Sequence, residues 1–174
     1  MKVFVNERSR FYSVANDTKC QVTFDPAAVD SYRLIGYENR LMSKDDFDNE
    51  KKDAGEIGAG QTITALYEIV PAEGFAAGVA AARFDVRYKK ELGGASRPLT
   101  LPVAVPGDLT KMSADMGLAA GITAYGLCLL SSEYKGTATI SMARDLVAPS
   151  VQEDPYGLRG QLLTLMERAS RQIQ

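Results

Sequence analysis

Apolar residues alternate with polar ones in the first part of this chain and recur at helical spacing in the rest. Phe84, Val86 and Tyr88 lie between charged neighbours, which is typical of a strand with one solvated face. Beyond Gly107, the apolar residues of 116–130 recur at helical spacing instead. An α+β fold is expected when strands and helices are segregated along the sequence in this way. The sequence predicts an antiparallel β-sandwich of roughly five to eight strands, followed by a C-terminal bundle of about three helices.

The boundaries of the predicted strands follow from this alternation and from the turn residues between the alternating segments. Strands are predicted over residues 19–24, 29–37, 62–70, 83–89 and 99–105. Pro98, Pro102 and Pro106 surround the last of these, as is typical of an edge strand. The acidic segment 42–60 contains several glycines and is predicted to be irregular.

Helices are predicted in the second part of the chain. Ser113 is the expected N-cap of the first helix, which is apolar on both faces and is therefore expected to be buried. A shorter helix is predicted over 137–147, and Asp154 followed by Pro155 predicts the start of the last one. The predicted organisation is a leading segment over 1–17, a β-sandwich over 18–107 and a helical unit over 108–174.

The chain contains no histidine, and this absence excludes several classes of catalytic and metal site. It removes the Ser-His-Asp and Cys-His nucleophile arrangements and the histidine-containing zinc sites. Cys20 and Cys128 lie too far apart in sequence for a metal or redox motif; two separately buried thiols are expected, and a disulfide remains open. A net charge of −2 gives no reason to expect a nucleic acid partner. No catalytic residue and no cofactor are predicted, and the chain is not expected to be an enzyme.

Acidic residues gather in the segment 45–56, which is the main candidate for a metal site. Carboxylate oxygens are the ligands that calcium prefers, and the acidic side chains partly follow the spacing of an EF-hand loop. The candidate ligands are Asp46, Asp48, Glu50 and Asp53. The match then fails, because Lys51 stands where the loop needs glycine and Ile57 where it needs glutamate. A solvated polar loop is the favoured interpretation, and a calcium-stabilised binding module is one alternative.

A second alternative is a carboxylate-based hydrolase. Glu38 and Glu56 would have to meet in one cleft for such chemistry, and a role in stabilising a loop with Arg33 or Arg40 is the simpler expectation. The glycines of 55–60 precede a predicted strand rather than opening a helix, so they do not form a dinucleotide fingerprint.

Three blocks of sequence resemble a known family. They read YRLIGYENR at 32–40, DAGEIGAG at 53–60 and TITALYEIVP at 62–71. These blocks are similar to the C-terminal region, formerly a domain of unknown function, of YfbK-like bacterial von Willebrand factor type A domain proteins. The signature residues are Tyr32, Arg33, Gly36, Tyr37, Glu38, Asn39, Arg40, Asp53, Gly55, Glu56, Gly58 and Gly60.

The resemblance implies an upstream von Willebrand factor type A domain, to which residues 1–17 would connect, and a location in the cell envelope. The Asp-x-Ser-x-Ser metal motif of that domain does not occur here, so the chain is expected to be a fragment or a truncated product. Residues 1–8 lack the apolar core of a signal peptide, and the apolar run 116–130 is too short to span a membrane. The function expected is a non-catalytic accessory domain that mediates or braces protein–protein contacts with an unidentified partner.

Overall fold

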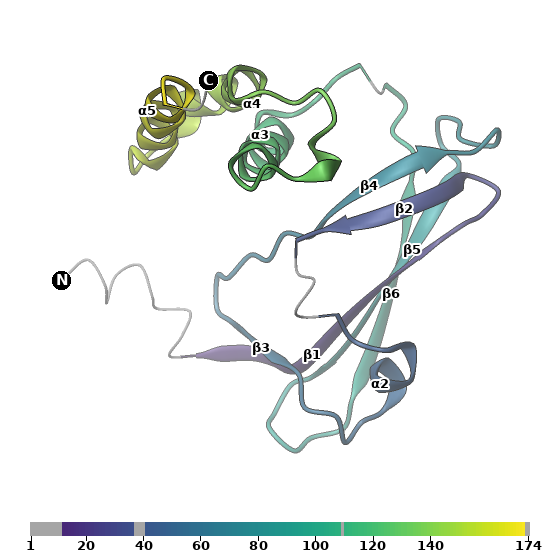
Figure 1. Ribbon diagram of the computed structural model, residues 1–174. Coiled ribbons are helices and arrows are strands. Elements are labelled where there is room, and N and C mark those ends of the chain that lie inside the picture. The colour runs from purple at the N-terminus through teal and green to yellow at the C-terminus, as the bar shows by residue number, and fades with distance from the viewer. Residues whose placement is uncertain (1–11, 37–40, 109, 173–174) are drawn as a thin grey trace. The chain divides into compact units, whose positions relative to one another are not determined.

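The structure is a computed structural model that describes residues 12–36, 41–108 and 110–172 (Figure 1). The chain divides into two compact units, a strand unit over 1–107 and a helical unit over 108–174. The described residues contain six strands and four α-helices, and all strand pairs are antiparallel. The predicted α+β class is therefore confirmed.

The larger sheet of the strand unit has four strands in the order β3-β1-β5-β6. The strands are β1 (Ser13–Phe24), β3 (Gly55–Gly58), β5 (Ala80–Lys89) and β6 (Arg97–Ala104). Val22 lies opposite Phe84, and Phe84 lies opposite Leu101, so the three apolar side chains share one face. This inner face gathers the apolar half of the alternating pattern, and the polar half forms the outer face.

The smaller sheet pairs β2 (Val29–Ile35) with β4 (Leu66–Pro71), and it lies across the strands of the larger sheet (Figure 1). Aromatic rings join the inner faces of the two sheets. The Phe24 ring centroid of β1 lies 4.4 Å from that of Tyr32 and 5.4 Å from that of Tyr67. Edge-to-face and tilted contacts of this kind stabilise aromatic pairs beyond simple burial.

The two sheets are tied together at one end of the strand unit, which we call the closed end. The buried core there consists of Ala28, Val29, Ala81 and Val105, with Phe24, Ile69 and Phe75 packed against it. The Ala72 N–H donates to the Ala28 carbonyl at 2.9 Å, and the Asp25 N–H donates to the Ala81 carbonyl at 2.9 Å. The turn that links β1 to β2 is thereby bonded to both sheets.

Several predicted boundaries in the strand unit are wrong. β1 begins at Ser13, inside the predicted leading segment, and β4 begins at Leu66 rather than at residue 62. The segment predicted to be irregular contains both β3 and the short helix α2 (Lys44–Asp48). The Ser43 hydroxyl accepts a hydrogen bond from the Asp46 N–H at 3.1 Å and so caps α2. β3 contains two glycines and depends on pairing with β1, so its own sequence carries little strand signal.

The helical unit contains three α-helices and two short 3-10 turns. Its elements are α3 (Ala114–Leu129), η3 (Glu133–Lys135), α4 (Ile140–Val147), η4 (Ala148–Glu153) and α5 (Leu158–Ser170). Tyr125, Ile140, Ala143, Val147 and Met166 form the buried core. No helix that the structure describes is long and apolar enough to cross a membrane.

The predicted start of the first helix is confirmed, and that of the last is wrong. The Ser113 hydroxyl accepts a hydrogen bond from the Met116 N–H at 3.1 Å. Pro155 is not the first residue of α5, which begins at Leu158. The Asp154 carboxylate nevertheless accepts a hydrogen bond from the Gly160 N–H at 2.9 Å, so this residue still serves the helix terminus from a distance.

The other two helix expectations also need correction. The middle helix begins at Ile140, three residues later than predicted, because the Thr139 hydroxyl caps it by accepting from the Met142 N–H. The first helix was expected to be buried on both faces, but Met116, Ile122 and Leu129 each remain about half exposed.

Two glycines let α3 and α4 approach closely. A Cβ at Gly117 would lie 2.7 Å from the Leu146 carbonyl oxygen, and one at Gly121 would lie 2.6 Å from a methyl group of Val147. A Cβ at Gly126, in the same helix, would meet nothing within 4 Å. The backbone of α3 therefore contacts α4 directly at Gly117 and Gly121, which lie about one helical turn apart.

This contact predicts opposite effects for two identical substitutions. Gly121→Ala should lower the free energy of unfolding by about 1–3 kcal/mol, because the added methyl overpacks the contact with α4. Gly126→Ala should raise it by about 0.5–1 kcal/mol, because alanine is the better helix former. Urea denaturation of both variants measures the difference. Equal effects of the two substitutions would contradict the close approach of α3 and α4.

Candidate functional site

The strand unit contains a large apolar groove on the inner face of the four-stranded sheet. The groove has a volume of about 770 Å³. All four strands of that sheet contribute to its floor, and β4 and the segment 61–65 form its wall. The main apolar lining residues are Cys20, Val22, Phe24, Ile57, Ile63, Tyr67, Ile69, Ala82, Phe84, Val86 and Val103.

The groove exists because the two sheets differ in strand number. Four strands present an apolar face, and the two strands of the smaller sheet cover it only in part. Ile63 is therefore 55% exposed and Val103 is 45% exposed, although both lie in the groove. Contiguous apolar surface of this kind marks an interaction or ligand site more often than scattered apolar residues do.

The polar side chains that line the groove are few, and all but Glu56 are uncharged types. Desolvation by the apolar walls raises the pKa of the Cys20 thiol. Desolvation also raises the pKa of the Tyr67 hydroxyl, with smaller contributions from Tyr32 and Cys20. A thiol attacks as its thiolate, so the raised pKa argues against a nucleophilic role for Cys20 at neutral pH. Glu56 is the one acidic residue among the described residues that line the groove.

The cysteines differ from their expected burial. Cys20 is exposed in the groove, and Cys128 of α3 is half-buried. Neither forms a disulfide. The alternation of β1 placed Cys20 on the inner face as predicted, but that face is not fully covered.

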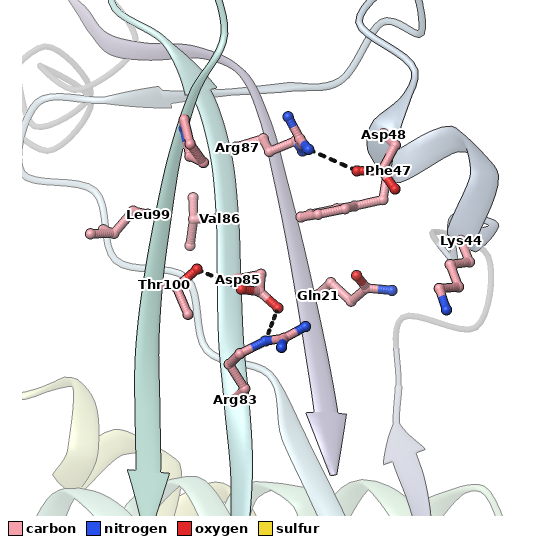
Figure 2. Close-up of a pocket in the computed structure, with 11 residues that line it drawn as sticks. Gln21, Lys44, Phe47, Asp48, Arg83, Asp85, Val86, Arg87, Leu99 and Thr100 are labelled. Atoms are coloured by element: carbon pink, nitrogen blue, oxygen red, sulfur yellow. Dashed lines mark hydrogen bonds and ion pairs between the residues drawn. The ribbon is translucent and has the colours of Figure 1, made fainter.

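The outer face of the same sheet carries a small polar cavity of about 270 Å³ beside α2 (Figure 2). Asp85 lies at its centre: it accepts hydrogen bonds from Arg83 Nε at 2.7 Å and from Thr100 Oγ1 at 2.7 Å. The Thr100 hydrogen bond, followed by that of Arg83, holds the pKa of Asp85 below its usual value. The charge of this carboxylate is thus compensated by Arg83 of its own strand, β5, and by Thr100 of the neighbouring strand, β6.

Basic side chains of the four-stranded sheet bind the acidic segment 45–56, which we call the acidic loop. Lys19 is only 5% exposed as a residue, and its ammonium donates to the carbonyl oxygens of Asp46, at 2.9 Å, and Asn49. Arg87 Nη2 donates to Asp48 Oδ1 at 2.8 Å, and its guanidinium lies 5.5 Å from the Phe47 ring centroid (Figure 2). Cations of the protein itself therefore hold the loop against β1 and β5.

The predicted metal ligands are not brought together. The Asp46 carboxylate lies 3.6 Å from the Lys52 ammonium, and the Asp48 carboxylate pairs with Arg87. The Glu50 carbonyl, rather than its carboxylate, receives a weak contact from Lys89. Across residues 12–36, 41–108 and 110–172, no three acidic or cysteine side chains, Asp53 included, gather as metal ligands would. The arrangement therefore favours the polar-loop interpretation.

The signature residues that the structure describes build the framework around the groove. Gly36 and Gly60 have φ values of +72° and +75°, which favour glycine. Gly55 and Gly58 lie on β3 opposite Thr18 and Ser13 of β1.

The remaining signature residues are Tyr32 and Arg33 of β2, Asp53 just before β3, Glu56 of β3, and residues 37–40. Tyr32 lies on the inner face of β2, where its ring contacts Phe24, although the residue is 59% exposed. Arg33 pairs with Glu68 of β4 across the outer face, not with Glu56. Tyr37, Glu38, Asn39 and Arg40 lie outside the described residues, and so does the proposed partner of Glu56 in a carboxylate pair.

Sequence reasoning missed the groove and the role of Lys19. The alternation in β1, β5 and β6 identified the inner apolar face, but it carried no information on how many strands oppose that face. From sequence, a lysine on the polar side of a strand is expected to be solvated. The fold instead places Lys19 next to the carbonyl oxygens of Asp46 and Asn49.

Removing the Lys19 ammonium should loosen the acidic loop. Lys19→Met keeps the aliphatic stem but leaves the Asp46 and Asn49 carbonyls without their donor, so we expect a loss of about 1–3 kcal/mol in unfolding free energy. Amide hydrogen exchange of residues 44–50 should accelerate at the same time. Lys44→Met, on the exposed side of α2, is the matched control; similar exchange in both variants would contradict the assigned role of Lys19.

The ion pair between Lys89 and Asp17 predicts pH-dependent stability. Lys89 Nζ donates to Asp17 Oδ2 at 2.7 Å, and this hydrogen bond, with smaller contributions that include the Ala54 N–H, holds the pKa of Asp17 below its usual value. The pKa of an aspartate in the unfolded chain is about 3.9. The stabilisation is therefore present above that pH and lost as the pH falls through the lower folded pKa.

Lys89→Met should raise the pKa of Asp17 and remove this pH-dependent contribution. Carboxyl-carbon NMR titration of the folded protein measures the shift directly. Asp108, whose pKa is lowered chiefly by Thr110, is the internal control and should not move. An unchanged Asp17 titration would rule out Lys89 as the cause.

Comparison with known proteins identifies the family. A family described as "Uncharacterized protein YfbK, C-terminal" matches residues 9–85 and 77–172. The chain is 32% identical over 180 residues to the uncharacterized protein YfbK of Escherichia coli (strain K12), a match that covers 93% of this chain and 31% of that protein. The chain thus spans about a third of the length of this relative. No solved structure matches. Because the family match covers nearly the whole chain, the chain belongs to the family of the YfbK C-terminal region.

Proposed function

We propose that this chain is a non-catalytic accessory domain that acts through protein–protein contact, with the apolar groove as its contact surface. The observation that supports this most strongly is the uncovered inner face of the four-stranded sheet. A folded domain gains by burying such surface, at about 1.5–3 kcal/mol for each aliphatic or aromatic side chain that becomes fully covered.

The chemistry of the groove supports contact rather than catalysis. Its thiol and its tyrosine hydroxyl are held in their neutral forms by desolvation. No second carboxylate from the described residues lines the groove beside Glu56, so the hydrolase alternative gains no support there. The outer-face cavity is smaller, at about 270 Å³, and Asp85, Arg83, Arg87 and Asp48 around it are already engaged in ion pairs or hydrogen bonds.

The relative supplies a setting for this contact. The chain matches only 31% of the E. coli protein, so the remainder of such a protein contains segments that could occupy the groove. We place the domain beside a von Willebrand factor type A domain in the cell envelope, as the family resemblance implies. The domain would then mediate or brace contacts for its larger protein.

A charge placed in the groove should abolish partner capture. Val103→Glu introduces a carboxylate at a half-exposed groove position, where it costs little folding stability but opposes burial by a partner. Thr23→Glu is the matched control, since Thr23 is exposed on the outer face of the same sheet opposite Arg83. Thermal unfolding first confirms that both variants fold. The unmodified chain and the two variants are then immobilised and incubated with envelope and cytosolic extracts, and the captured proteins are compared.

We expect a protein that binds the unmodified chain and Thr23→Glu but not Val103→Glu. Capture of the same protein by the unmodified chain and by both variants would show that the contact uses a surface other than the groove. Absence of any captured protein from either extract would contradict an interaction role.

A further inference from the structure

We propose that the groove is occupied by an extended segment of a partner protein, which adds a third strand to the smaller sheet along the outer edge of β4. This inference rests on the proposed function and specifies its geometry. Main-chain hydrogen bonds to β4 would supply affinity, and alternate side chains entering the groove would supply specificity.

The edge of β4 is suited to strand addition. Among the described residues β4 pairs only with β2, so its other edge presents a row of unpaired N–H and C=O groups. The pairing with β2 is regular from Ser31 opposite Val70 to Ile35 opposite Leu66, without a bulge. No proline interrupts residues 66–70. We call this row of backbone groups the open edge of β4.

The open edge borders the groove. Tyr67 and Ile69 of β4 line the groove, whereas no residue of β2 does, so the groove lies on the β4 side of the smaller sheet. Neighbouring strands lie about 4.7–4.9 Å apart, and successive side chains point to opposite faces. A strand bonded to β4 would therefore lie over the groove and direct every second side chain into it.

The other edges are less suitable. Pro98 and Pro102 lie within β6, and each removes a backbone donor from the edge of the larger sheet. β3 is four residues long, and its pairing with β1 has irregular register. The outer edge of β2 has no partner among the described residues, but a strand added there would not cover the groove. Among the strands that the structure describes, β4 alone combines a regular open edge with an uncovered apolar surface.

The groove also defines the chemistry of the added segment. Its inward residues should be apolar, to cover Ile63 and Val103, which are about half exposed. Its outward residues would lie beside the ion pair that Glu68 of β4 forms with Arg33 of β2, so they should be polar, without a required sign of charge. The expected segment thus alternates apolar and polar residues.

The test begins with random ten-residue peptides displayed on phage and selected on the full chain. Peptides that also bind Val103→Glu are removed by counter-selection. We expect the surviving peptides to carry apolar residues at every second position. The tightest peptide is then synthesised with a single N-methyl group at each backbone position in turn.

Strand addition predicts that the effect of methylation alternates along the peptide. Only every second N–H of an added strand bonds to β4. Methylation at those positions should raise Kd roughly 5- to 10-fold, and methylation at the intervening positions should change Kd little. Amide exchange of the labelled chain with bound peptide should slow at alternate residues of 66–70. Exchange at Thr100 of β6 should stay unchanged.

Each other outcome overturns the inference. Strand addition would be excluded by any of three results: peptides with apolar residues at helical spacing, methylation effects that do not alternate along the peptide, or no slowing of amide exchange in β4. They would leave the contact function intact if Val103→Glu still abolishes capture of a protein from the extracts. Failure to select any groove-dependent peptide would exclude an extended segment as occupant. Self-association of the chain that competes with the peptide would instead identify a second copy in the groove.

Discussion

The strand unit depends on the tie between its two sheets at the closed end. There the turn after β1 is hydrogen-bonded to both sheets, and the rings of Tyr32 and Tyr67 pack on Phe24. The buried residues there include the small side chains of Ala28 and Ala81 beside Val29 and Val105. Because the smaller sheet has only two strands, it covers one end of the larger sheet and leaves the rest of the inner face as the groove. The same constraint thus explains both the stability of the unit and its exposed apolar surface.

Electrostatic interactions on the outer face serve architecture. Lys19 and Arg87 hold the acidic loop against the sheet, and Lys89 pairs with Asp17 at the irregular part of β1. The cations that bind this loop come from β1 and β5, strands that are distant from it in sequence, so the sequence of the loop alone does not reveal them. The inner and outer faces consequently have different roles, one available for contact and one internally paired.

Much of the fold could be predicted from local patterns. Alternation located β1 and β5 because their two faces differ sharply in polarity, and Ser113 marked the start of α3. β3 was missed because its glycines carry no strand preference, and it forms only through pairing with β1. The start of α5 was misplaced because Asp154 bonds the helix terminus from outside it. The errors lie where a distant contact, rather than local sequence, defines the element.

Local sequence patterns were enough to predict the α+β class, the absence of histidine chemistry and the apolar identity of the inner face. The sequence also carries the signature that identifies the family. Long-range contacts explain why two strands oppose four, why the groove lies beside β4, and why Lys19 meets the loop carbonyls. The physical reason is that side-chain periodicity reports which face of a strand is buried, whereas strand number and edge pairing depend on hydrogen bonds between residues far apart in the chain.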